Sequence, residues 1–124
     1  MKKVKFIIIL VSLCSCSIFQ EKGITFKITN SADFPITGVK ISTSENLESV
    51  SFDSIQKNES QEGFLSMKNN KMDGSYTLSY THRDGSTKKI SSGYYTNGTV
   101  LDSYIRFEIT NDSALVKFGE FPDY

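Results

Sequence analysis

Residues 73–86 read DGSYTLSYTHRDGS, and this stretch is the clearest strand signal in the chain. Tyr76, Leu78 and Tyr80 alternate with small polar residues, and this period of two predicts a β-strand with one face on a core. Asp-Gly pairs stand on both sides of the run. Asp-Gly between alternating runs favours a hairpin, because glycine adopts a positive φ without a Cβ clash. The segments 75–82 and 87–92 are therefore predicted to pair.

Similar short runs lie on both sides of this stretch, separated by turn residues such as those at 30–35 and 111–112. None of them has a convincing helical period. Their apolar residues are Ile24, Phe26 and Ile28; Ile36, Val39 and Ile41; Val50 and Phe52; Phe64, Leu65 and Met67; Ile105, Phe107 and Ile109; and Ala114, Val116 and Phe118.

About seven or eight short strands, spaced roughly 10–12 residues apart, predict an all-β fold. We expect an antiparallel β-sandwich of immunoglobulin-like size, with a small up-and-down β-barrel as the alternative. The sandwich is favoured because residues 44–49 and 56–62 look like the longer connections that a Greek key requires. The chain has no tryptophan, so a standard antibody-type domain is not expected.

The first residues have the composition of an export signal. Lys2, Lys3 and Lys5 precede the apolar run from Phe6 to Leu13. At about eight residues, this run is much shorter than the roughly 20 that span a bilayer, which argues against the alternative of an uncleaved anchor. Ordinary signal-peptide cleavage prefers small residues of the A-x-A type, yet the first alanine is Ala32. A different peptidase is implied.

The stretch Leu13-Cys14-Ser15-Cys16 resembles the bacterial lipobox, in which an aliphatic residue stands three positions before the cysteine that receives the lipid. Cys16 fits this pattern, whereas Cys14 fits it badly because bulky Leu13 would then precede the cut. The chain is thus similar to bacterial lipoproteins with small immunoglobulin-like β-domains. The resemblance implies lipidation at Cys16. Because Ser17 rather than aspartate follows, it also implies the bacterial outer membrane, with the periplasmic or cell-surface face undecided.

Processing at Cys16 would divide the chain into three parts: the signal peptide 1–15, the lipidated cysteine with a short tether 16–22, and a single β-sandwich domain 23–124. Several acyl chains, at about 0.8 kcal/mol per buried methylene, would make the anchor permanent. The tether reaches at most roughly 20 Å, at 3.3–3.6 Å per residue. The domain is therefore expected to lie close to the membrane.

Composition excludes several functional classes. Without residues 1–15 the chain has 11 basic and 14 acidic residues, and this net charge of about −3 offers no basic patch for nucleic acid. With Cys14 removed and Cys16 alkylated, no thiol remains for a disulfide, a nucleophile or a thiolate metal site. The mature chain would depend on its core alone.

Catalytic signals are also missing. No HExxH, GxSxG, P-loop or GxGxxG motif is present, and His82 is a lone histidine. Asp73-Gly74 and Asp84-Gly85 each offer one acid, whereas Ca²⁺ takes 6–8 oxygen ligands. We therefore predict no enzyme, no catalytic residue, no metal and no cofactor. A carboxylate pair brought together from two strands remains an alternative.

The candidate binding surface lies in Gly93-Tyr94-Tyr95-Thr96-Asn97-Gly98. Adjacent tyrosines on a strand point to opposite faces, so one would pack inward while the other is exposed as an interface anchor. The alternative is that Tyr94 and Tyr95 cover the core edge beside an Asn97-Gly98 hairpin turn. Phe34, in the turn Asp33-Phe34-Pro35, is the fourth candidate, either a recognition tip or a hydrophobic plug.

These observations predict a lipid-anchored, non-enzymatic envelope protein that acts as a protein-binding or assembly-accessory module. Its expected partners are the membrane, through the lipid on Cys16, and an envelope protein that is not identified. One way to bind such a protein is to pair a sheet edge with a partner strand. The alternative is an inhibitor or immunity-type lipoprotein, which would insert an acidic or aromatic loop into the active site of a hydrolase.

Overall fold

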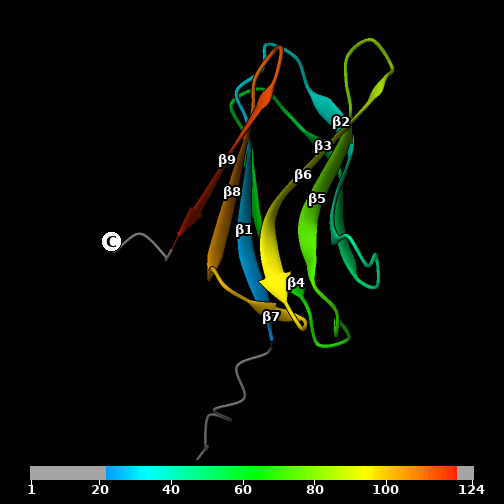
Figure 1. Cartoon of the computed structure of the whole chain (residues 1–124). Helices are drawn as coiled ribbons and strands as arrows, with labels where there is room; N and C mark the ends of the chain where they lie inside the picture. Colours follow the sequence, from blue (N-terminus) through cyan, green and yellow to red (C-terminus); the bar gives the residue numbers. More distant parts are fainter. Residues whose placement is uncertain (1–21, 120–124) are drawn as a thin grey trace, which may run out of the picture.

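The computed structural model describes residues 22–119 as two β-sheets packed around one core (Figure 1). The lipobox at 13–16 and the last five residues lie outside this range. Nine strands follow one another along the chain: β1 (Gly23–Asn30), β2 (Ile36–Thr43), β3 (Ser49–Ile55), β4 (Ser60–Ser66), β5 (Gly74–Thr81), β6 (Thr87–Thr96), β7 (Thr99–Val100), β8 (Tyr104–Ile109) and β9 (Ala114–Gly119). The prediction of an all-β sandwich is confirmed.

The described range contains no helix that is long and apolar enough to cross a membrane.

The two sheets have the strand orders β4-β1-β8-β9 and β3-β2-β5-β6-β7. The ABED and CFG orders of antibody constant domains are different, in agreement with the expectation that this is not an antibody-type domain. One pairing, β1 with β8, is parallel and departs from the antiparallel prediction. Parallel neighbours require a long crossover, and here the connection contains the whole second sheet.

The core is built from the alternation that the sequence displays. Ile24, Phe26 and Ile28 of β1 are buried, and so are the inward-facing residues of β5 and β8. Across the parallel pair, Phe26 lies beside Ile105 and Ile28 lies beside Phe107. Each fully buried side chain of this kind contributes about 1.5–3 kcal/mol relative to exposure.

The predicted hairpin of β5 and β6 is confirmed, with Tyr80 opposite Lys88 and Thr81 opposite Thr87. In its turn, the Gly85 N–H donates to the His82 carbonyl at 2.9 Å, and the His82 N–H donates to the Ser86 carbonyl at 2.8 Å. Gly85 has φ +84°, which explains why glycine stands there.

The two predicted long connections are wrong. Residues 44–48 join β2 to its antiparallel neighbour β3 as a simple hairpin loop, and residues 56–59 cross to the other sheet as a short link. The second prediction failed because β4 is an edge strand with a solvated outer face. Ser60 and Glu62 are exposed there, and such polar residues look like a loop in the sequence.

Candidate functional site

The four candidate contact residues do not form one surface. The proximal end of the sandwich is the end where β1 begins, and it comprises the loops 44–48, 67–73 and 101–103 with the turn 97–98. The distal end is opposite and comprises the loops 31–35, 56–59, 82–86 and 110–113. Tyr94, Tyr95 and Asn97 lie at the proximal end, whereas Phe34 lies at the distal end (Figure 1).

The two adjacent tyrosines point in opposite directions. The Tyr95 side chain is completely buried with its ring centroid 5.6 Å from that of Tyr76, so Tyr95 cannot be a surface contact residue. Tyr94 is 51% exposed, and its hydroxyl donates to the Asp73 carboxylate at 2.9 Å. The strand shifts register at Gly93, which has φ +78°. Only Tyr94 of this pair therefore remains a candidate for contact.

Asn97 forms a turn, as the alternative interpretation anticipated. Asn97 and Gly98 have φ of 50° and 70°, and they join the paired residues Thr96 and Thr99. Positive φ at both central residues defines a type I′ hairpin turn. The Asn97 N–H donates to Asp73 at 2.9 Å, so the same carboxylate holds both Tyr94 and the turn.

Phe34 is a plug. Only 6% of it is exposed, its ring meets the His82 ring edge to face at 4.6 Å between centroids, and the Arg83 guanidinium lies 4.9 Å from its centroid. His82 is in turn bonded through Nε2 to the Asn111 carbonyl at 3.3 Å. His82 and Arg83 thus cover an aromatic ring that belongs to the core.

A buried polar cluster fixes the proximal loops. The two N–H groups of the Asn70 side-chain amide are shared among three acceptors: the Thr43 hydroxyl at 2.8 Å, the Tyr95 hydroxyl at 3.1 Å and the Glu45 carboxylate. Partial burial raises the pKa of Glu45, but hydrogen bonds from Tyr95, the Met72 N–H and Asn70 outweigh it, and the pKa is lowered overall. The ionised carboxylate therefore ties these loops together.

The strongest candidate site is the open side of the sandwich between β6 and β9. None of the residues singled out in the sequence predicted it. β7 pairs with β6 only at Tyr95 and Thr96, so residues 87–92 form an unpaired edge. β9 is the edge of the other sheet. Across this opening, which we call the β6–β9 slot, four partly buried apolar side chains line the inner side: Ile90 from β6 and Ala114, Val116 and Phe118 from β9.

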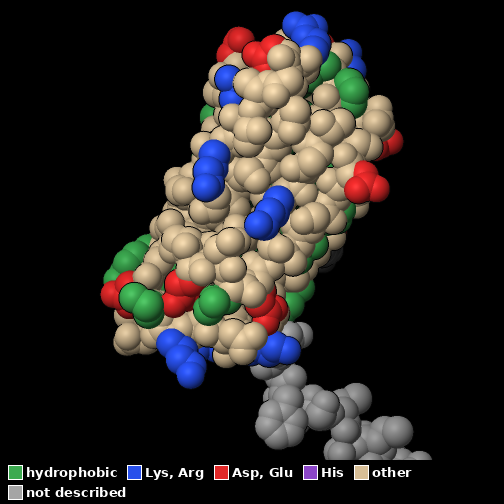
Figure 2. All heavy atoms as spheres, turned by 90° about the vertical axis from the view of Figure 1, so that its right-hand side faces the viewer, with side chains coloured by type: hydrophobic (Ala, Val, Ile, Leu, Met, Phe, Trp, Pro, Cys, Tyr) green, Lys and Arg blue, Asp and Glu red, His purple; other side chains and the backbone are tan. Residues whose placement is uncertain are grey.

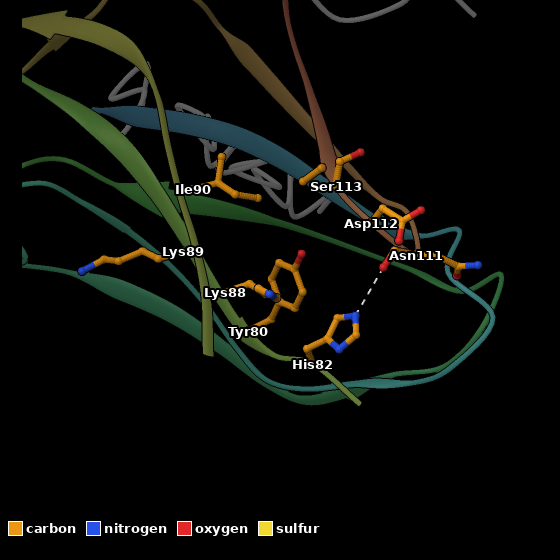
Figure 3. Close-up of a pocket in the computed structure, with 9 residues that line it drawn as sticks. Tyr80, His82, Lys88, Lys89, Ile90, Asn111, Asp112 and Ser113 are labelled. Carbon is orange, nitrogen blue, oxygen red and sulfur yellow. Dashed lines mark hydrogen bonds between the residues drawn. The ribbon is translucent and has the colours of Figure 1, made fainter. Parts of the chain in front are cut away.

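The slot narrows at one end and widens at the other. At Gly93, an added Cβ would lie within 3 Å of the Phe118 ring, so the two edges touch there. Towards the distal end the slot opens into a hollow of about 370 Å³. Figure 3 shows its lining, which is Tyr80, His82, Lys88, Lys89, Ile90, Asn111, Asp112, Ser113 and Ala114.

The floor of this hollow is polar. In Figure 3 the Tyr80 hydroxyl points into the space between Ile90 and Ser113, while Lys89 points away. Burial raises the pKa of Tyr80, so its hydroxyl stays protonated at neutral pH and can both donate and accept a hydrogen bond. His82 is engaged by Asn111 and Asp84. No group of three His, Asp or Glu side chains suited to a metal occurs in residues 22–119.

The turn fixes which backbone groups of β6 face outward. In an antiparallel ladder, pairs that exchange hydrogen bonds alternate with pairs that do not. The His82 N–H bonds to the Ser86 carbonyl, so this pair exchanges hydrogen bonds and every second pair after it does the same. Residues 88, 90 and 92 of β6 therefore exchange hydrogen bonds with β5. Thr87, Lys89 and Ser91 therefore direct their N–H and C=O groups away from the sheet. These groups are the donors and acceptors that an added strand would use.

A signal for this site was present in the sequence. Lys88 and Lys89 directly follow Thr87 at the start of the ten-residue β6, and lysine is common on strands that form an exposed sheet edge. On the other side of the sandwich, by contrast, the edge strands β3 and β4 are joined by residues 56–59 and lie against each other. The β6–β9 side is the more open of the two.

Comparison with known proteins adds information about the fold. No protein-family model matches the sequence, and no curated protein matches it. The structure is similar to the NMR structure of the protein from Eubacterium rectale, with a TM-score of 0.52 and 10% sequence identity. The match covers 82% of this chain and 92% of that chain. At this identity, the similarity concerns the β-fold alone and carries no function.

Proposed function

We propose that this chain is a lipid-anchored, non-enzymatic protein of the bacterial envelope that binds a protein partner by adding a strand of the partner to β6. Residues 1–15 would be removed and Cys16 would carry the lipid in the outer membrane. The observation that carries the binding proposal is the unpaired edge of β6 beside a partly buried apolar slot. Strand addition uses main-chain hydrogen bonds for affinity and alternate side-chain pockets for specificity.

The slot suggests the chemistry of the partner. An added strand would place every second side chain against Ile90, Ala114 and Val116, which favours apolar residues at those positions. Lys88 and Lys89 flank the wide end of the slot, and Lys117 is exposed on β9. An extended segment with alternating apolar residues and at least one acidic residue would complement this surface.

Substitution at Ser91 tests the proposal, because its outward N–H plays no part in the β5–β6 ladder. Proline at this position removes that N–H and obstructs an incoming strand, and proline is tolerated on edge strands. Ser91→Ala is the matched control, since both variants lose the 3.1 Å hydroxyl contact with Thr77. With full-length protein crosslinked in its native host, we expect the alanine variant to retain the partner and the proline variant to lose it at least tenfold.

The inhibitor alternative predicts the opposite pattern. A protein that inserts a loop into an active site would keep its partner in Ser91→Pro and lose it when one loop is shortened. Circular dichroism and the unfolding midpoint of both Ser91 variants show whether the sandwich is intact. Retention of the partner by a folded Ser91→Pro variant would reject strand addition at β6.

A further inference from the structure

Exposed apolar side chains gather at the proximal end of the molecule. Among the described residues, six large hydrophobic side chains stand out as exposed. One of them, Leu115, lies apart from the others on the edge strand β9. The other five define what we call the proximal surface: Leu47 (55% exposed), Phe64 (40%), Met72 (67%), Tyr94 (51%) and Leu101 (62%).

These side chains come from different segments that hydrogen bonds hold together. The Gly98 N–H donates to the Met72 carbonyl at 2.8 Å, which ties the 67–73 loop to the β6–β7 turn. Asn69 donates to Glu48 at 2.7 Å, which ties the same loop to the loop that carries Leu47. The proximal surface is therefore a built feature of the fold rather than a set of loose loop tips.

The start of the described chain belongs to this surface. The Met67 N–H donates to the Lys22 carbonyl at 2.7 Å, so the chain enters the sandwich beside the 67–73 loop. Phe64 packs over Gly23, the first residue of β1. The six steps from Cys16 to Lys22 span at most about 20 Å. A lipid on Cys16 would thus hold this end of the sandwich next to the bilayer.

The lysines of the proximal end are free to contact a lipid headgroup layer. Lys22, Lys68 and Lys71 are exposed, and none of them forms an ion pair within residues 22–119. Four acids lie at the same end and remain charged, but hydrogen bonds hold three of them against neighbouring side chains: Glu45 to Tyr95 and Asn70, Glu48 to Asn69, and Asp73 to Tyr94, with Asp102 as the exception. In Figure 2 the basic side chains project furthest at the lower end, below the acidic ones.

We propose that the proximal surface rests on the membrane that holds the Cys16 lipid, with its apolar side chains among the headgroups and its lysines on the phosphates. This inference rests on the lipid anchor of the proposed function. Exposed apolar side chains flanked by lysines are typical of protein surfaces that lie on a bilayer. The docked sandwich would stand upright, with the wide mouth of the β6–β9 slot directed away from the membrane and open to an envelope partner.

Spin labels on the lipidated full-length protein test this orientation. Cys16 is alkylated in the mature chain, so one introduced cysteine is the sole thiol. Met72→Cys and Leu101→Cys report on the proximal end, and Asp112→Cys reports on the distal end. We expect vesicles of phosphatidylethanolamine and phosphatidylglycerol (3:1) to reduce collisions of a water-soluble nickel chelate with both proximal labels at least threefold. The distal label should be unchanged.

Two further measurements separate the anchor from the docking. Flotation with the vesicles reports the anchor alone, and a processed chain that does not float would overturn both proposals. A chain that floats but shows equal nickel accessibility at all three labels would overturn the docking and leave the anchor intact.

Hydrogen exchange provides the second measurement. Vesicles should slow exchange in residues 67–73. The triple variant L47S/M72S/L101S should lose this protection, while the matched control Leu115→Ser keeps it. Equal protection in both would also overturn the docking.

Discussion

Short connections close both ends of the sandwich, but apolar side chains are covered at one end and exposed at the other. At the distal end Phe34 is covered by His82 and Arg83. At the proximal end Met72, Leu101 and Tyr94 remain exposed, although the two loops and the strand end that carry them are held by hydrogen bonds. Exposure at the proximal end is therefore not a sign of missing structure. It is typical of a surface that is covered by something else.

A buried asparagine organises each end, and the partners differ. Asn30 bonds only to backbone groups: it donates to the carbonyls of Phe34 at 2.8 Å and Ile55 at 2.9 Å, and it accepts from the Ala32 N–H at 3.0 Å. Asn70 instead bonds to side chains. Backbone groups cannot turn away to find another partner. The distal end should therefore lose more stability when its asparagine is removed.

The largest expected effect separates two aromatic residues that the sequence alone marked as equivalent candidates. Phe34→Ala should lower the free energy of unfolding by about 4 kcal/mol, because it empties a buried site under two turns. Tyr94→Ala should lower it by less than about 1 kcal/mol, since its ring is half exposed. Urea unfolding of both variants measures the difference. Phe34→Leu, which keeps most of the apolar volume, should fall between them, and equal losses for Phe34→Ala and Tyr94→Ala would contradict the burial of Phe34.

The next effect concerns the distal asparagine. Asn30→Ala should cost about 3 kcal/mol, because it leaves two carbonyls and one N–H without their partner in a buried site. Asn30→Asp is the matched control. It keeps the acceptor for Ala32 but loses the two donated bonds, so it should also be strongly destabilised. A cost below about 1 kcal/mol for either variant would mean that water replaces the side chain without loss.

The proximal asparagine should matter less. Asn70→Ala is expected to cost about 2 kcal/mol, since the Thr43 and Tyr95 hydroxyls can reorient and Tyr95 keeps its 3.0 Å bond to Glu45. Chemical denaturation compares this variant with Asn30→Ala directly. Hydrogen exchange should speed up in residues 67–73 and leave the distal turns unaffected. A larger loss for Asn70→Ala than for Asn30→Ala would reverse the comparison between the two ends.

The sequence was sufficient for most of the strands and for one of their pairings, that of β5 with β6. Alternation found the inward residues of β1, β5 and β8, and the second Asp-Gly located the β5–β6 turn, because both signals are local. The parallel pairing of β1 with β8 could not be predicted, since it joins residues far apart in the chain. Ser60 and Glu62 concealed the first half of β4, because the outer face of an edge strand is solvated and has little apolar signature.

The candidate site was predicted less well, for a related reason. The two adjacent tyrosines predicted that one of them would be exposed. The sequence did not show that Tyr95 and Phe34 are the buried ones, because their burial depends on residues distant in the chain that pack over them. The β6–β9 slot is defined by strands that do not pair with each other, and a missing pairing has no local sequence pattern. Lys88-Lys89 was the available hint, and it acquires meaning only when β6 is known to be an edge.

The smallest expected effect is a change in the pKa of Asp84, in the turn at the distal end that joins β5 to β6. Hydrogen bonds from the Ser86 hydroxyl and from the Ser86 N–H, the latter at 2.8 Å, hold the pKa of Asp84 to about 2, below its ordinary value of 3.8. A lowered carboxyl pKa stabilises the turn above pH 3.8, and this contribution disappears as the pH falls through about 2. Ser86→Ala removes the hydroxyl donor and should move the pKa of Asp84 upward towards 3.8, as followed by carboxyl ¹³C chemical shifts. Ser113→Ala at the neighbouring turn should leave it unchanged, and an unaltered pKa in Ser86→Ala would show that the backbone N–H alone sets the ionisation of this turn.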